Sequence, residues 1–92
     1  MDDLEKAGKV LDALKAAERE PLPAALPILN GLAGLIQGST EQSFEVQDMR
    51  AEVFTAICEL GKALHRGQPA EQLWAPAINA AERWRGLVKL SV

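Results

Sequence analysis

The sequence is poor in cysteine and in aromatic residues. Cys58 is the only thiol among 92 residues, so no disulfide can form within the chain. Chains without disulfides are typical of the cytosol, and we expect this protein to be cytoplasmic. Aromatic residues make up only 4% of the chain. Because aromatic and β-branched residues favour strands whereas alanine and leucine favour helices, the composition predicts an all-α protein.

The sequence also lacks an excess of positive charge and a long apolar run. Its formal net charge is −3, which argues against the phosphate neutralisation that gives DNA-binding proteins most of their non-specific affinity. The most apolar segment, 22–36, is shorter than the roughly 20 residues that span a bilayer and is interrupted by Pro23 and Pro27. The first residues are acidic where a signal peptide carries positive charge. We therefore expect no signal peptide and no membrane segment.

Apolar residues nevertheless make up 48% of the chain, which is too many for an intrinsically disordered protein. No repeat or linker divides the sequence, so we predict one domain, 1–92. A domain of this size buries only about two-thirds of the surface that its unfolded chain exposes. Because such a core is small, we expect the protein to bind another protein. We also expect it to form a homodimer.

The longest predicted helix covers about residues 41–66 and is the centre of the fold. Its apolar residues recur three and four apart and therefore share one face. They are Val46, Met49, Val53, Ile57, Leu60 and Leu64. Phe54 widens this face. Ser39 or Thr40 can cap the start of the helix, and Gly67 can end it.

A second predicted helix, at about 25–37, is apolar nearly all round. We place its start near residue 25 because Pro27 is tolerated in the first turn of a helix but not in its interior. A helix with little polar face is buried on more than one side. It is therefore either the centre of the bundle or a helix whose spare face meets another subunit. Leu26, Leu29 and Leu35 are our candidate partner-binding residues in this segment.

Two further segments complete the fold. Residues 3–19 carry an apolar stripe at helical spacing, and so does the segment after residue 68. Pro76 is expected to kink this last segment or to divide it into a turn at 69–74 and a helix at 76–89. Together the segments predict a small four- or five-helix bundle with up-down topology and short loops.

Five more residues are candidates for partner binding. Arg50 falls among the apolar positions of the long helix, where a charge needs a partner, a path to water or a place at an interface. Phe54 lies one turn further along. Trp74 and Trp84 share a broad side of the last segment, and tryptophan is usually a core residue but also dominates binding hot spots. Arg85 next to Trp84 suits an acidic protein surface.

The most conspicuous polar feature is an acidic stripe along the long helix. Its members are Glu41, Glu45, Asp48, Glu52 and Glu59. The pair formed by Glu45 and Asp48 resembles the carboxylate pairs that hold Mg²⁺ in all-α nucleotide pyrophosphatases. Those enzymes need a second pair on a facing helix, and the sequence offers none at a similar spacing. We therefore interpret the stripe as a solvated helix face and expect no metal.

No other motif indicates catalysis. Cys58 and His65 are about two turns, roughly 10 Å, apart on one helix, which is too far for a catalytic dyad, so we interpret them as a small buried cysteine and a helix-terminal histidine. We expect no cofactor. The sequence thus favours a non-enzymatic interaction protein, such as a regulatory adaptor, chaperone or anti-activator that binds through apolar helix faces. A DNA-binding regulator using Arg83, Arg85 and Lys89 is the first alternative, and a metal-dependent enzyme the second.

Overall fold

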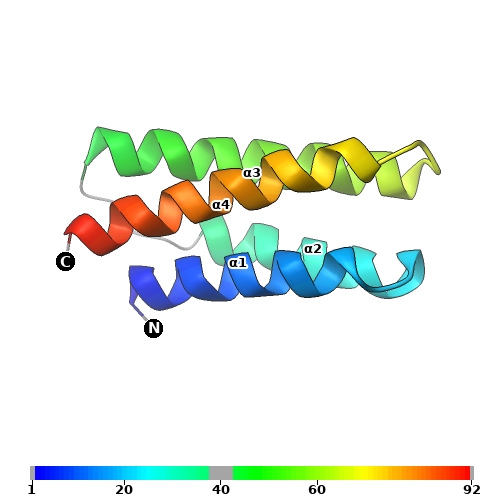
Figure 1. Cartoon of the computed structure of the whole chain (residues 1–92), viewed down its shortest axis with the longest axis horizontal. Helices are drawn as coiled ribbons and strands as arrows, with labels where there is room; N and C mark the ends of the chain where they lie inside the picture. The colour runs from blue at the N-terminus through cyan, green and yellow to red at the C-terminus, as the bar shows by residue number, and fades with distance from the viewer. Residues whose placement is uncertain (1, 38–42, 92) are drawn as a thin grey trace.

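The computed structural model describes residues 2–37 and 43–91 and contains four α-helices (Figure 1). They are α1 (Asp3–Glu18), α2 (Leu22–Gln37), α3 (Phe44–His65) and α4 (Glu71–Ser91). Consecutive helices run in opposite directions, and both ends of the chain lie at the same end of the molecule. The predicted all-α, up-down bundle is therefore confirmed, with four helices and with no strand in the described segments.

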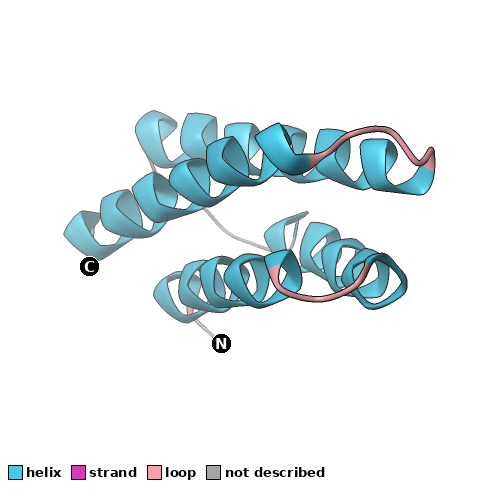
Figure 2. Ribbon diagram, turned by 45° about the vertical axis from the view of Figure 1, so that its right-hand side comes forward, coloured by secondary structure: helices cyan, strands magenta, loops and turns pink. Residues whose placement is uncertain are grey.

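The four helices form a ring in which each one packs against two neighbours. α1 contacts α2 and α4, and α3 contacts the same two helices. Within the described segments, the diagonal pairs make no such contact. Figure 2 shows the α1–α2 and α3–α4 hairpins one above the other, in a bundle of 38 × 20 × 18 Å. α2 is one member of this ring, with contacts to α1 and α3, so the alternative that placed the second helix at the centre of the bundle is wrong.

The core is built from one apolar face of each helix. α1 contributes Ala7, Val10, Leu11, Leu14 and Ala17; α3 contributes Val46, Met49, Val53, Ile57, Leu60 and Ala63. The spacing of three and four residues predicted both faces, because it returns the side chain to the same side of a helix. None of the described helices combines the length and the apolar character needed to cross a bilayer.

Side chains cap the N-termini of α1 and α3. The Asp2 carboxylate accepts a hydrogen bond from the Glu5 backbone N–H at 2.8 Å, and the Ser43 hydroxyl accepts one from the Val46 N–H at 3.2 Å. Each bond satisfies a backbone donor that has no partner within the helix. α3 thus begins at Phe44, a few residues later than predicted, and its cap is Ser43. The predicted caps, Ser39 and Thr40, lie outside the described residues.

A glycine ends α3, as the sequence predicted. Gly67 has a φ of +69°, its N–H donates to the Leu64 carbonyl, and the Gln68 N–H donates to the Ala63 carbonyl at 2.9 Å. This pair of bonds is the Schellman arrangement, in which two C-terminal carbonyls gain donors and the residue after the cap takes the left-handed conformation. The chain can then turn sharply into α4.

Two helix boundaries differ from the prediction because prolines are tolerated inside helices. α2 begins at Leu22 and contains Pro27, and α4 continues through Pro76 without being divided. Both prolines are exposed, so the carbonyl that each deprives of a donor lies on the outer side, where water can reach it. Burial of the residues on the opposite side of each helix then outweighs the missing hydrogen bond.

The same substitution at two glycines should have opposite effects on stability. Gly67→Ala should destabilise the protein by about 1–2 kcal/mol, because a side chain disfavours the left-handed conformation. Gly86 lies in α4 with no described atom within 4 Å of the position of a Cβ, so Gly86→Ala should stabilise by about 0.5–1 kcal/mol. Urea denaturation measures both changes. A Gly67→Ala protein as stable as the wild type would contradict the helix ending described above.

Candidate protein-interaction site

The outer side of α2 carries no charged residue. Four exposed residues among those whose side chains the structure describes, here called the outer face of α2, are Pro27, Asn30, Gly31 and Gly34. The whole of Leu22–Gln37 contains no acidic or basic side chain. By contrast, exposed charges such as Lys9, Glu52 and Arg83 cover the outer sides of the other three helices. α2 is therefore the helix whose exposed surface another polypeptide can cover without removing a charge from water.

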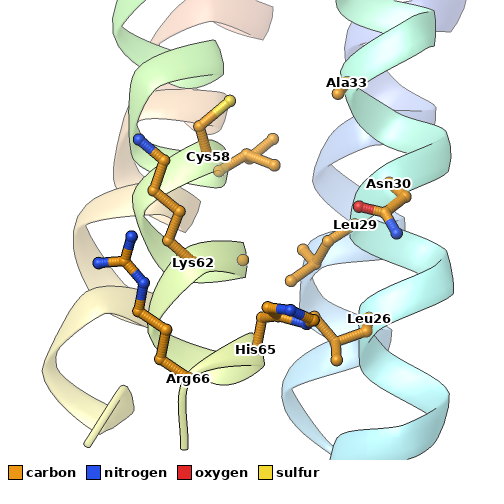
Figure 3. Close-up of a pocket in the computed structure, with 10 residues that line it drawn as sticks. Leu26, Leu29, Asn30, Ala33, Cys58, Lys62, His65 and Arg66 are labelled. Carbon is orange, nitrogen blue, oxygen red and sulfur yellow. The ribbon is translucent and has the colours of Figure 1, made fainter. Parts of the chain in front are cut away.

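A groove of about 390 Å³ lies between α2 and α3, beside this outer face (Figure 3). Its α2 wall consists of Leu26, Leu29, Asn30 and Ala33. Its α3 wall consists of Ile57, Cys58, Gly61, Lys62, His65 and Arg66. In Figure 3, His65 reaches from α3 toward Leu26, whereas Asn30 stands on the opposite wall. This α2–α3 groove joins an apolar floor to polar edges.

A second hollow, of about 250 Å³, is lined by Ile36 of α2 and by residues of the first half of α3. These are Arg50, Ala51, Phe54 and Thr55. Arg50 and Phe54 continue at helical spacing into Cys58, Gly61 and His65, so one stripe of α3 lines both hollows. The two hollows and this stripe make up what we call the α2–α3 seam.

The seam is positively charged although the protein is acidic overall. Lys62, His65 and Arg66 line the groove, Arg50 lines the second hollow, and neither lining includes a carboxylate. Lys62, His65 and Arg66 form no salt bridge with a described residue. An ion pair between Lys15 and Glu82, at 3.7 Å, links α1 to α4 elsewhere. The groove therefore has two basic groups, Lys62 and Arg66, whose charge is available to a partner.

The structure brings together four of the candidate residues named from the sequence. Leu26 and Leu29 line the groove, and Arg50 and Phe54 line the second hollow. Leu29 is buried, whereas the other three are half-buried. The other four, Leu35, Arg85 and the two tryptophans, lie elsewhere.

Leu35 is half-buried on the opposite edge of α2 from Leu26, because nine residues correspond to about two and a half turns. Arg85 lies on the α1 side of α4, where its Nε is 3.6 Å from the position that a Cβ on Gly8 would take. The candidate set therefore does not form one surface. Only its members on the α2–α3 seam are neighbours.

Both tryptophans belong to the core, so of the two roles that the sequence left open for them the structure shows burial. Trp84 is 0% exposed and Trp74 is 9% exposed. Trp84 Nε1 is buried and has no hydrogen-bond acceptor among the described residues. A helical bundle with so few aromatic residues fills its centre with the largest side chains available, which removes both indoles from the surface.

The structure also locates the acidic stripe of α3 and the cysteine. Glu45, Asp48, Glu52 and Glu59 are exposed, and the described part of the chain contains no group of side chains suited to a metal ion. Glu41 lies outside it. Cys58 is half-buried rather than buried, because it lines the groove instead of pointing into the core.

Sequence reasoning missed several residues of the seam. Asn30, Ala33, Lys62 and Arg66 line the groove, and none of them had been proposed as a partner-binding residue. The stripe that continues from Arg50 at helical spacing would have indicated the α3 wall. Which helix lies opposite this stripe depends on the packing of the whole bundle, and the sequence does not contain that information in any local pattern.

Buried tryptophans should be protected from a quencher that is soluble in water. Because Trp74 and Trp84 are the only two indoles and both are buried, iodide should quench the fluorescence of the folded protein far less than that of the urea-unfolded protein. Single-tryptophan variants, Trp74→Phe and Trp84→Phe, separate the two signals. Strong quenching of either variant while circular dichroism still shows a folded helical protein would contradict the burial described here.

Comparison of the chain with known protein families, with curated proteins and with solved structures found no match. The fold and the α2–α3 seam are thus the observations from which a function can be inferred.

Proposed function

We propose that this protein is a non-enzymatic interaction module that binds another protein through α2 and the adjoining seam. The observation that carries this proposal is that α2 has no charged residue but packs against only two helices. A helix in this position has an outer side that faces water in the isolated bundle. In α2 that side is uncharged, which is typical of a surface that is covered in a complex.

The glycines of the outer face support the same proposal. Gly31 and Gly34 lie inside a helix, and apart from the adjoining residues and backbone of that helix no described atom lies within 4 Å of the position of a Cβ on either one. Each glycine in a helix costs about 0.5–1 kcal/mol relative to alanine. Packing within the chain does not require this loss of stability. The close approach of another backbone does require small residues, so the two glycines favour an external partner.

The partner in this proposal is a second copy of the chain or a different protein that the module regulates, escorts or restrains. The alternative of a DNA-binding regulator gains no support, because Arg83 and Arg85 lie on different sides of α4. Arg83 lines a hollow toward α3 together with Glu52 and Glu59, whereas Arg85 lies near Gly8 of α1. These arginines do not form one basic surface for phosphate.

A lysine on the outer face should abolish partner binding without affecting the fold. Gly34→Lys places a charge where the partner would cover it, and Gly86→Lys is a matched control on the exposed side of α4. We expect Gly34→Lys to lower the affinity for the partner by at least about tenfold, because desolvating an uncompensated charge is unfavourable, whereas Gly86→Lys should bind like the wild type.

Light scattering measures self-association, and affinity capture with quantitative mass spectrometry measures binding to other proteins. Circular dichroism confirms that both variants fold. The proposal would be wrong if the wild type were monomeric and captured the same proteins, in the same amounts, as Gly34→Lys.

A further inference from the structure

We propose that the α2–α3 groove is the docking site of an acidic amphipathic helix contributed by a different protein. This inference rests on the proposed function, and it specifies the surface that is used and the chemistry that the partner presents. Apolar side chains of the docked helix enter the groove, and its carboxylates meet the basic residues on the α3 wall.

The floor of the groove can accept apolar side chains. Leu26, Leu29 and Ile57 provide apolar walls, and two small residues, Ala33 and Gly61, also line the groove. No described atom lies within 4 Å of the position of a Cβ on Gly61. Side chains of a neighbouring helix at positions i, i+3 or i+4 and i+7 enter a groove of this kind.

The charges at the edge of the groove select the partner. Lys62, His65 and Arg66 lie on the α3 wall, and the α2 wall contributes the neutral amide of Asn30. No carboxylate lines the groove, although the protein has a net charge of −3. Basic groups beside an apolar floor are complementary to a segment in which acidic residues flank apolar ones, and they repel a basic segment.

The dimensions of the seam favour a helix as the occupant. From Arg50 to Arg66, α3 extends about 24 Å, the length of a helix of about 16 residues. Lys62 and Arg66 lie at one end of this stretch, where both are exposed. An added β-strand would need an open sheet edge, and the described segments contain only helices.

A pair of synthetic peptides tests this inference. Both have about 16 residues, with leucine at helical spacing on one face; one has glutamate and the other lysine on the flanking positions. Fluorescence anisotropy of the labelled peptides measures their affinity for the full chain. We expect the glutamate peptide to bind at least about tenfold more tightly than the lysine peptide, and added salt to weaken its binding.

Two variants with the same change in net charge locate the site. Lys62→Glu/Arg66→Glu reverses charges at the groove, whereas Lys9→Glu/Lys89→Glu reverses exposed charges on α1 and α4. The first variant should lose binding of the glutamate peptide by at least about tenfold, and the control should retain most of it.

Cys58 provides an independent measure without any substitution, because it is the only thiol and lines the groove. The bound glutamate peptide should slow its reaction with a thiol-specific reagent. Equal binding of both peptides, equal loss in both double variants, or binding that leaves the reaction of Cys58 unchanged would each overturn the inference. Absence of any binding of the glutamate peptide would overturn it as well.

Two further outcomes distinguish the proposed interaction module from the docking of an acidic helix in the groove. If the glutamate peptide does not bind but Gly34→Lys abolishes association with a partner, the interaction module remains and the acidic helix in the groove is wrong. If Lys62→Glu/Arg66→Glu converts a self-associated wild type to monomers in light scattering, the occupant of the groove is a second copy of the chain, and the docking of a different protein is wrong.

Discussion

In a ring of four helices, each helix can bury only the side that faces its two neighbours and the core. The rest of the structure depends on this limit. A helix with two neighbours turns one side to the core and leaves the opposite side outside. α1, α3 and α4 match this constraint with charged outer sides, whereas α2 combines a buried side containing Ala25, Leu29 and Ile36 with an outer face that has no charge. The buried side of α2 alone supplies its part of the hydrophobic core. The proposed binding of another polypeptide rests on this uncharged outer face of α2.

The two helices of the α2–α3 seam differ in the charge that they contribute. α2 contributes apolar and neutral side chains to the seam, and α3 contributes the basic ones, from Arg50 to Arg66. The acidic residues of α3, such as Glu45 and Glu52, are exposed and line neither hollow of the seam. One helix thus separates its charges by sign, which gives the seam a polarity that the net charge of the chain does not reveal.

Local sequence patterns predicted the helices well, because the spacing of apolar residues and the capping residues are local properties. The periodicity of Val46, Met49, Val53, Ile57 and Leu60 predicted the buried face of α3, and Gly67 predicted its end. Pro27 led to a wrong start for α2, and of the two alternatives for Pro76 the division of α4 is wrong, because burial on the far side of each helix outweighs one missing hydrogen bond. The candidate site was predicted only in part. Leu26, Leu29, Arg50 and Phe54 meet at the seam, but the burial of Trp74 and Trp84 is set by the packing of all four helices and is not a local property of α4.

The accessibility of the outer face of α2 in the cell tests the central claim most directly. A cysteine replacing Asn30 in a Cys58→Ser background reports on this face, and a cysteine replacing Asn79, an exposed asparagine of α4, is the matched control. In dilute purified protein we expect a thiol-specific reagent to modify both positions at similar rates. In the cell that produces the protein, position 30 should be protected and position 79 should remain reactive. Equal reactivity of the two positions in the cell would show that no polypeptide covers the outer face of α2.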